Sequence, residues 1–261
     1  MDGIPEKINA IWIHANLATM TGERPYGRIE DGALAVADGK IAWVGKMNRL
    51  PEDLKRKDAT AHDVQGQWIT PGFIDCHVHI TGGGGEDGFS TQAPVVPLSQ
   101  YTLNGVTSVV GLLGTDDETR STAGLLARTR ALREEGLSAW CWTGGYHVPP
   151  TTLTGSVRKD IVSVDCIIGL GELAISDHRS SQPTFDELAR LASEVHVAGL
   201  IARKAGVLHL HLGDGDRGLE LVRGLLADTE LPPRVFHPTH VNRRKALFKE
   251  ACELAKQGVT I

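Results

Sequence analysis

The sequence predicts an α/β fold: a TIM-like (β/α)8 barrel, truncated after about its seventh strand, with a small N-terminal β-sandwich portion. Three observations support this prediction. From residue 72 onward, apolar strand-like runs alternate with amphipathic helices, which is typical of a parallel sheet covered by helices. Polar residues follow the carboxyl end of nearly every strand, where such a barrel places its sites. No Gly-x-Gly-x-x-Gly motif follows the first strand, which disfavours a dinucleotide-binding fold.

The composition is that of an ordinary globular protein, with 23% charged and 41% hydrophobic residues in a chain of 261. A net charge of −5 without a lysine or arginine run argues against nucleic-acid binding. No apolar stretch reaches the ~18 residues of a membrane span, and the acidic N-terminus is unlike a signal peptide. The four cysteines are scattered without a Cys-x-x-Cys pair, which indicates reduced thiols. We therefore expect a cytoplasmic protein without nucleic-acid or membrane partners.

Residues 1–70 are predicted to form the N-terminal part of a small β-sandwich domain. The pair Asp38-Gly39 stands between two apolar runs and is a strong signal for a two-residue hairpin turn. Residues 50–57 favour a helical turn, and no helical period runs through the rest of this segment. A Thr-Pro-Gly turn leads into the second domain, which is predicted to cover residues 71–261.

The second domain is predicted to alternate strands with helices along its whole length. The strands are expected at residues 73–76, 107–113, 139–143, 166–175, 207–212, 235–239 and, as a beginning only, 259–261. The helices between them are expected at residues 98–104, 118–135, 185–204, 218–227 and 243–257. Thr184 and Glu187 have the spacing of a capping box, and Gly258 is the expected stop of the last helix.

The strand count ends at the seventh strand, because the chain stops at Ile261. A closed barrel of eight strands needs one more helix, a strand and a final helix, and seven strands leave two unpaired edges. We therefore expect an incomplete barrel from a truncated chain or a partial gene product, inactive by itself and prone to aggregation.

The stretch 72–79, Gly-Phe-Ile-Asp-Cys-His-Val-His, carries the first candidate metal ligands. Residues two apart in a strand point to the same face, so His77 and His79 aim at one point beyond the end of this strand. A divalent metal ion could bind there. A run of four glycines follows and adds little side-chain bulk around this point.

Later strand ends supply further ligand candidates, namely Glu172 on the fourth strand, His209 and His211 on the fifth, and His240 after the sixth. Together with the first two histidines they could hold two zinc-like ions bridged by the carboxylate, which would polarise a carbonyl and activate a water. The spacing leaves open which histidine of each pair binds, so His209 and His237 remain alternatives. Three further histidines are interpreted as structural or exposed: His62, His178 and His196.

The motif Gly-Phe-Ile-Asp-x-His-x-His resembles the first barrel strand of the amidohydrolase superfamily. Within that superfamily, residues 72–261 are similar to isoaspartyl dipeptidase, with matching runs at 82–86, 107–116, 143–149, 174–180 and 238–243. Residues 8–75 look more like imidazolonepropionase, another amidohydrolase, with runs at 16–20, 29–34 and 39–45. A shared N-terminal architecture accommodates this mixture, and a recombinant, chimeric or mis-assembled sequence is the alternative.

The resemblance implies a binuclear metal site. Its ligands would be His77, His79, Glu172, His211 and His240, holding two zinc ions bridged by Glu172 and a hydroxide. Many family members use a carboxylated lysine as the bridge. Here Glu172 offers a carboxylate that needs no carbon dioxide.

The resemblance also implies residues that bind the substrate. Glu86 would pair with the substrate's α-ammonium group, and Arg179 and Arg243 would bind its carboxylates. Tyr146 would donate its hydroxyl to the tetrahedral oxyanion, and Thr115 would contact the substrate backbone. Taken singly, each of these five residues could equally belong to an ordinary loop or surface.

The implied function is a zinc-dependent hydrolase that cleaves β-aspartyl (isoaspartyl) dipeptides, with a small-molecule substrate and a homo-oligomeric full-length form. The family's general base is an aspartate at the end of the eighth strand, and neither Asp214 nor Asp216 has the spacing to replace it. One alternative is a cyclic amidohydrolase of the imidazolonepropionase type, which acts in histidine degradation. Another alternative is an inactive fragment that binds metal.

Overall fold

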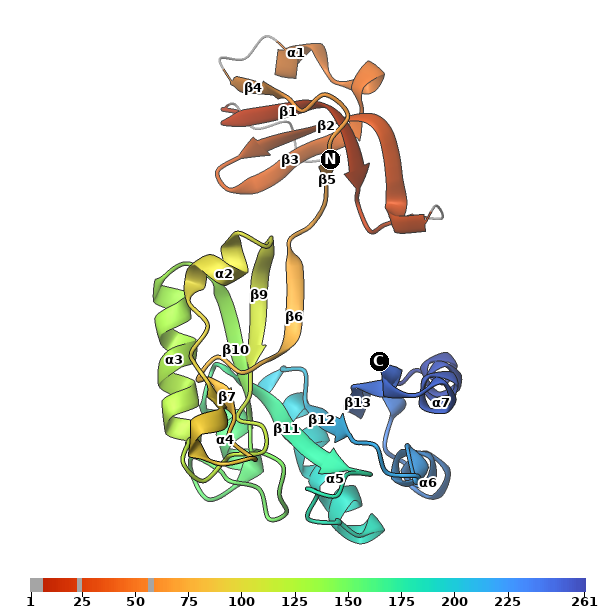
Figure 1. Cartoon of the computed structure of the whole chain (residues 1–261). Helices are drawn as coiled ribbons and strands as arrows, with labels where there is room; N and C mark the ends of the chain where they lie inside the picture. The colour runs from red at the N-terminus through yellow and green to blue at the C-terminus, as the bar shows by residue number, and fades with distance from the viewer. Residues whose placement is uncertain (1–6, 23–24, 56–58) are drawn as a thin grey trace. The chain divides into compact units, whose positions relative to one another are not determined.

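The computed structural model describes residues 7–22, 25–55 and 59–261. The chain divides into two compact units, Met1–Gly72 and Phe73–Ile261, whose helices and strands are labelled in Figure 1. None of the helices in the described part is long and apolar enough to cross a lipid bilayer.

The first unit is built on one mixed sheet in the order β3-β2-β1-β4, with β5 pairing to β1. Its strands are β1 Ala10–Ala18, β2 Arg28–Ala37, β3 Lys40–Lys46, β4 Thr60–Asp63 and β5 Trp68–Ile69. The predicted hairpin is confirmed, because β2 and β3 are antiparallel and both turn residues, Asp38 and Gly39, have positive φ.

The described part of the first unit also contains three short helices. They are α1 Glu52–Lys55 and the 3-10 turns η1 Pro25–Gly27 and η2 Met47–Arg49. Helix α1 matches the predicted helical turn at 50–57, of which residues 56 and 57 lie outside the described residues. Leu54 of α1 is fully buried in the same apolar cluster as Ile11, Ala33 and Ala35, so the alternating inward residues of β1 and β2 form the small core.

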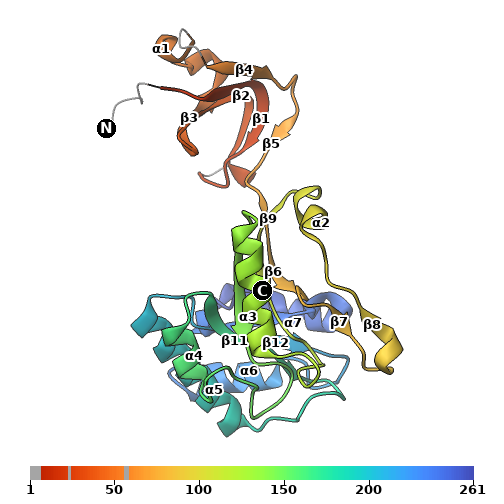
Figure 2. The same cartoon turned by 90° about the vertical axis from the view of Figure 1, so that its left-hand side faces the viewer.

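The second unit contains a six-stranded sheet in the order β13-β12-β11-β10-β9-β6. Its strands are β6 Phe73–Val78, β9 Val106–Gly111, β10 Ser138–Thr143, β11 Ile167–Ile175, β12 Val207–Leu212 and β13 Phe236–Thr239. All neighbouring pairs are parallel, and the sheet curves into a half-barrel with helices along its outer side (Figures 1 and 2). The predicted α/β barrel-type fold is confirmed.

The helices of this unit are α2 Leu98–Thr102, α3 Thr122–Glu134, α4 Val157–Ser163, α5 Phe185–Ala202, α6 Glu220–Asp228 and α7 Lys245–Lys256. The predicted capping box of α5 is confirmed by reciprocal hydrogen bonds between Thr184 and Glu187. Helix α3 begins later than predicted, because the side chain of Ser121 caps it by accepting from the N–H of Gly124. Helix α4 was not predicted, since its seven residues are too few to show a helical period.

The shorter elements are β7 Gly83–Gly84 and β8 Gln92–Ala93, which pair with each other, and the 3-10 turns η3 Phe89–Thr91, η4 Pro233–Val235 and η5 Val241–Arg243. The predicted strand at 259–261 is wrong: the structure assigns no strand there. Gly258 has φ 98° and ends α7 as expected. The N–H of Val259 then donates to the carbonyl of Leu254, so these residues complete the helix end.

The alternation of side chains along β12 explains why one face of the sheet packs into the apolar core while the other face carries candidate functional residues. Leu208, Leu210 and Leu212 are fully buried in the apolar cluster that also contains residues of α5. His209 and His211, at the alternate positions, must therefore point to the opposite, concave face of the sheet. The same strand thus supplies both the core packing and candidate functional side chains.

Candidate metal centre

Histidines from several strand ends surround the carboxylate of Glu172 on the concave face of the half-barrel. Glu172 lies on β11 and its side chain is 1% exposed. Nε2 of His77, on β6, lies 3.6 Å from Oε2 of Glu172, and Nε2 of His79, directly after β6, lies 3.8 Å from Oε1. From β12 and the end of β13, Nδ1 of His211 and Nε2 of His240 lie 2.9 and 3.7 Å from Oε2. The structure therefore brings all five predicted metal ligands together.

These donors form two groups that share Glu172. One group contains His77, His79 and Glu172, the other contains Glu172, His211 and His240, and the ligand atoms of each lie within 4.8 Å of one another. Two donors bound to one tetrahedral zinc-class ion at about 2.0–2.2 Å lie about 3.3–3.6 Å apart. Imidazole nitrogens and carboxylate oxygens also suit such ions chemically. The donor set is consistent with a binuclear metal site bridged by Glu172.

Burial keeps two of the histidine donors, His77 and His79, neutral, and hydrogen bonds keep the carboxylate of Glu172 ionised, which are the states that bind metal. Burial lowers the pKa of His77 to about 4 and also lowers the pKa of His79, although the charge of Glu172 opposes both shifts. Burial alone would raise the pKa of Glu172, but hydrogen bonds from His211 and His240 hold it below its ordinary value. Because metal ligands must be deprotonated, His77, His79 and Glu172 can bind an ion at neutral pH with little proton release.

The loop after β9 leaves room for the ring of His79. Gly114 has φ +80°, a conformation that residues with side chains rarely adopt. A Cβ at this position would clash with Cε1 of His79 and would lie 3.4 Å from Oε1 of Glu172. Gly114 is therefore required both by the backbone turn and by the space that the donor set occupies.

Tyr146 and Asp177 contact the metal cluster through His211. Tyr146 follows β10, is 4% exposed, and places its hydroxyl 2.8 Å from Nδ1 of His211. Burial raises the pKa of this phenol, so the hydroxyl keeps its proton. Asp177 follows β11 and lies 3.1 Å, through Oδ2, from Nε2 of His211. His211 is thus held between the carboxylates of Glu172 and Asp177.

Arg179 joins this cluster to Glu86. Its guanidinium donates to both oxygens of Asp177, from Nε at 3.0 Å and from Nη2 at 2.7 Å, and to Oε1 of Glu86 from Nη1 at 2.9 Å. It also lies over the ring of Tyr146, 5.5 Å from the centroid. Hydrogen bonds from Arg179 lower the pKa of Asp177 well below its ordinary value. Glu86, predicted to bind an ammonium group, therefore pairs with Arg179, predicted to bind a carboxylate.

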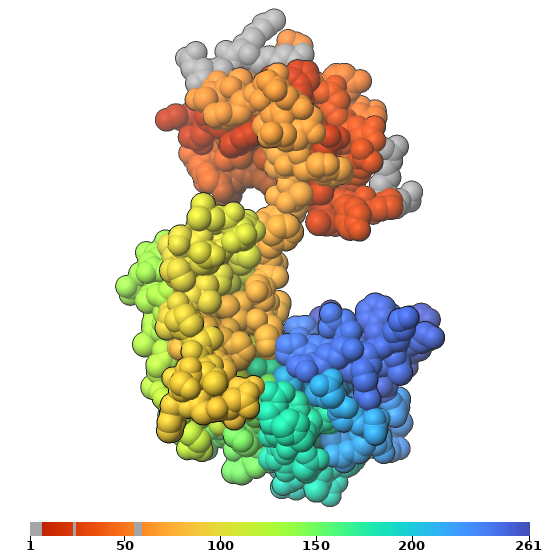
Figure 3. Space-filling model, in the orientation of Figure 1, coloured from red at the N-terminus to blue at the C-terminus, as the bar shows by residue number. Residues whose placement is uncertain are grey.

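The remaining predicted substrate residues lie further out. Thr115 lines a cavity of about 210 Å³ together with Gly85, Glu86, Phe89, Gln92, Asp116 and Thr119. Arg243 belongs to η5, and its Nη1 lies 3.7 Å from Oδ2 of Asp214. In the space-filling view, the second unit is hollowed between the segment that carries β6 and the segment that carries β13 and α7 (Figure 3).

Residues without a predicted role complete the site. Asp177 lies within the run 174–180 but was given no function. His209 was left as an alternative to His211, and the structure places His211 at Glu172 while His209 contacts Nδ1 of His77 at 2.9 Å. The His-x-His spacing of β12 was the signal for both residues, because it places them on one face.

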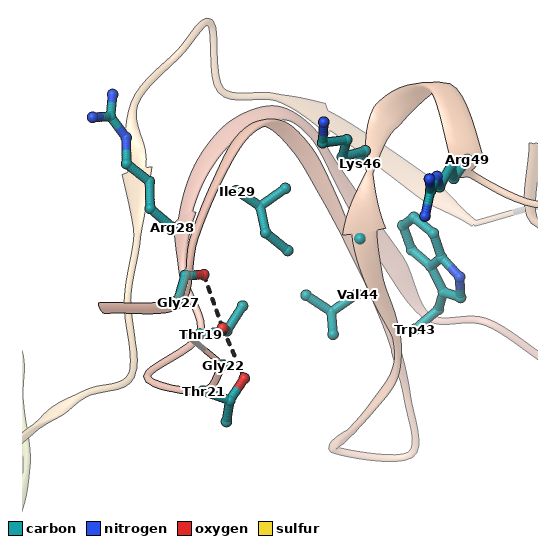
Figure 4. Close-up of a pocket in the computed structure, with 11 residues that line it drawn as sticks. Thr19, Thr21, Gly22, Gly27, Arg28, Ile29, Trp43, Val44, Lys46 and Arg49 are labelled. Carbon is teal, nitrogen blue, oxygen red and sulfur yellow. Dashed lines mark hydrogen bonds between the residues drawn. The ribbon is translucent and has the colours of Figure 1, made fainter. Parts of the chain in front are cut away.

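A separate cavity of about 570 Å³ lies in the first unit, where none of the predicted site residues is found (Figure 4). Its lining includes the basic side chains of Arg28, Lys46 and Arg49. The guanidinium of Arg28 is already engaged, because it pairs with Glu30 at 3.1 Å and lies over the ring of Trp68. This cavity therefore gives no indication of chemistry comparable to the Glu172 cluster.

Comparison with solved structures identifies the fold. The β-aspartyl dipeptidase from the thermophilic, keratin-degrading Fervidobacterium islandicum AW-1, in complex with a β-Asp-Leu dipeptide, is 41% identical with a TM-score of 0.85, covering 96% of this chain and 64% of that one. The chain belongs to the amidohydrolase superfamily. Ochratoxinase from A. niger, at 15% identity and a TM-score of 0.58, shares the fold of this amidohydrolase over 97% of the chain and 64% of its own.

Curated sequences give a partial likeness to a different amidohydrolase. Imidazolonepropionase from Colwellia psychrerythraea is 38% identical over 142 residues, which is 52% of this chain and 34% of that protein. The enzyme of the same name from Shewanella halifaxensis is 51% identical over 72 residues, 27% of this chain and 17% of that protein. No protein-family model matches the chain. The amidohydrolase described here thus matches about a third of the Colwellia enzyme, 17% of the Shewanella enzyme and 64% of the dipeptidase.

Proposed function

We propose that this amidohydrolase hydrolyses β-aspartyl dipeptides and holds two zinc ions at the Glu172 cluster. The observation that supports the proposal most is the 41% identity, over 96% of the chain, to a β-aspartyl dipeptidase crystallised with β-Asp-Leu. The two donor groups that share Glu172 agree with it, because hydrolysis of an amide at neutral pH needs a strongly activated water.

The chemistry assigns separate tasks to the ions and to the side chains. Two bound divalent ions would lower the pKa of a water molecule and polarise the amide carbonyl. Tyr146 would donate its hydroxyl to the carbonyl oxygen as negative charge develops there. Since burial raises the pKa of Tyr146, its proton remains available for this hydrogen bond. Asp177 would hold the ring of His211 in place from the side opposite Glu172.

The pairing of Glu86 with Arg179 fits a zwitterionic substrate. A β-aspartyl dipeptide carries one α-ammonium group and two carboxylates. Its ammonium would replace the guanidinium beside Glu86, and one carboxylate would replace Glu86 beside Arg179. Each charge then exchanges one ionic partner for another, which avoids an unpaired charge in a partly desolvated site. Arg243 is the second cation available for the other carboxylate.

A comparison of two isomeric dipeptides tests the proposal. The chain is extended by a family-like C-terminal part that supplies the eighth-strand aspartate, equilibrated with zinc, and incubated with β-Asp-Leu and with α-Asp-Leu, and free leucine is measured by chromatography. We expect release from the β-isomer alone, lost on chelation and restored by zinc. Glu86→Gln should lower kcat/KM without changing the metal content. Two bound ions with no leucine release from β-Asp-Leu would reject the assigned activity.

A second candidate function is imidazolonepropionase, favoured by the 38% identity over 142 residues to the Colwellia enzyme. Its substrate is a ring lactam with a single carboxylate, which gives an ammonium-binding Glu86 no task. Ultraviolet absorbance of imidazolonepropionate follows this reaction directly. Turnover of that compound without any release of leucine from β-Asp-Leu would reverse the order of the two candidates.

A further inference from the structure

Three histidines form a row that crosses the inside of the half-barrel next to the metal centre. His77 lies on β6 and His209 on β12, and three strands separate them in the sheet. The curvature of the sheet nevertheless brings Nδ1 of His77 to 2.9 Å from Nε2 of His209. The other nitrogen of His209, Nδ1, lies 3.0 Å from the backbone carbonyl oxygen of His237 and 3.1 Å from its Nδ1. His209 thus connects a candidate metal ligand to the backbone of β13.

The carbonyl group decides which nitrogen of His209 carries hydrogen. A carbonyl oxygen can only accept, so the 3.0 Å contact is a hydrogen bond when Nδ1 of His209 carries the hydrogen, and Nδ1 of His237, at 3.1 Å, then cannot donate to that atom. The ring is fully buried, and its hydrogen-bond partners are a carbonyl and two imidazoles, none of which is anionic. A charged ring would be costly in that setting, so His209 carries one hydrogen only. Its Nε2 is then an acceptor.

The same reasoning extends to His77. Because Nε2 of His209 accepts, Nδ1 of His77 must donate to it. The lone pair of neutral His77 is then on Nε2, the nitrogen that lies 3.6 Å from Glu172. Metal-binding histidines usually donate their second N–H to a carboxylate, a carbonyl or water, which fixes the tautomer and the ring orientation. Here the imidazole of His209 accepts this N–H, and His209 is itself fixed by its hydrogen bond to the backbone carbonyl of His237.

The indole of Trp142 holds both ends of the His77–His209 contact. Its ring stacks on His209 with a centroid distance of 5.2 Å and an interplanar angle of 20°. Its Nε1 donates to the carbonyl of Cys76 at 3.1 Å, directly before His77 in β6. One rigid side chain therefore fixes the plane of His209 and the strand that carries His77.

We propose that His209 is a positioning residue: anchored on the carbonyl of His237, it holds His77 in the Nδ1–H tautomer with Nε2 directed at the Glu172 cluster. The effect on metal affinity rests on the proposed function. The tautomer of His77 does not, because it is set by hydrogen bonds within the protein and can be read without a bound ion.

Two substitutions of similar polarity separate the contacts of His209. In His209→Gln, the side-chain oxygen can take the place of Nε2 and accept from His77. In His209→Asn, the shorter amide reaches only the position of Nδ1, so the contact with His77 is lost. Both variants and the wild-type chain are labelled with ¹⁵N-histidine, stripped of metal, and compared by two-bond ¹H–¹⁵N correlation spectra, with His77→Gln used to assign the signals of His77. Far-ultraviolet circular dichroism checks that each variant is folded.

We expect the Nδ1–H tautomer of His77 in the wild type and in His209→Gln, and a mixture of tautomers in His209→Asn. Zinc affinity, measured with a competing chelator, should fall roughly 10- to 100-fold in His209→Asn and much less in His209→Gln. An Nε2–H tautomer in the wild type, an unchanged tautomer in His209→Asn, or equal zinc affinity in both variants would overturn the positioning role. A tautomer effect in a chain that binds no zinc would reject the proposed metallohydrolase and still support the hydrogen-bond assignment.

Discussion

Replacing Glu172 by glutamine should weaken the binding of both ions together, because this carboxylate is the only anionic donor in either group. The substitution keeps the size of the side chain and one oxygen near His211, His77 and His240. Losing a group that merely supports a metal ligand costs about 10–100-fold in affinity. Glu172 is itself a donor, so we expect a loss of at least about 100-fold per ion, or about 2.7 kcal/mol.

Equilibrium dialysis against a zinc buffer gives a direct measurement of this loss. At free zinc about 100 times the wild-type Kd, the wild type holds close to two ions and a variant weakened about 100-fold holds about one at most. Elemental analysis per folded chain distinguishes the two. Unfolding at the same free zinc should show about 2.7 kcal/mol of stabilisation per wild-type site and about 0.4 kcal/mol per variant site.

The matched control is Glu187→Gln, the same change in the exposed capping box of α5. It should cost no more than about 1 kcal/mol of stability and leave the metal content unchanged. Retention of two ions at wild-type affinity by Glu172→Gln would refute the bridging role. Loss of metal in Glu187→Gln would show that the assay reports general destabilisation.

Three further outcomes are expected. In the chain extended by a family-like C-terminal part, Tyr146→Phe should lower kcat on β-Asp-Leu roughly 10²–10³-fold with little change in KM, the cost of losing one oxyanion donor, and steady-state kinetics would show whether KM rises instead. Gly114→Ala should reduce zinc affinity by displacing His79, measured by chelator competition; wild-type affinity would mean that the loop absorbs the added methyl group. Burial raises the pKa of Cys141 to about 12, so at pH 9 its thiol stays protonated and should resist iodoacetamide in the folded protein, while the exposed Cys252 should react; mass spectrometry before and after unfolding checks both.

The sequence was most informative where the two-residue period of a strand and its place in the predicted sheet pointed to the same site. Two His-x-His pairs in apolar runs of the sequence could be placed on one face each, and a parallel sheet places its strand ends at one edge, so the approach of His77, His211 and His240 to Glu172 was predictable. The spacing left open the choice of His211 over His209, and only the family resemblance selected His211. Both share a face of β12, and only the curvature of the sheet decides which ring reaches Glu172 and which reaches His77.

Contacts between loops were the least predictable part of the site. Glu86 and Arg179 are 93 residues apart, and no local pattern indicates that they pair. Asp177 was overlooked because its role depends on the side chain of Arg179, two residues later, folding back onto it. The strand predicted at 259–261 was a feature that the structure does not contain. A short apolar run was assigned as a strand without regard to the helix end that precedes it.

Side chains at the two edge strands of the half-barrel meet in the donor cluster around Glu172. His77 lies on the edge strand β6 and His240 directly follows the other edge strand, β13, yet their ring centroids are 4.7 Å apart. Five strand-to-strand steps of about 4.8 Å would separate these edges by about 24 Å in a flat sheet. Two ions bridged by Glu172 would connect the two histidine groups and, through them, the two edge strands. This connection is possible in the curled sheet and not in a flat one. Part of the free energy of metal binding would then offset the free-energy cost of bending the sheet. The measured metal affinity should therefore depend on how strongly the sheet is curled.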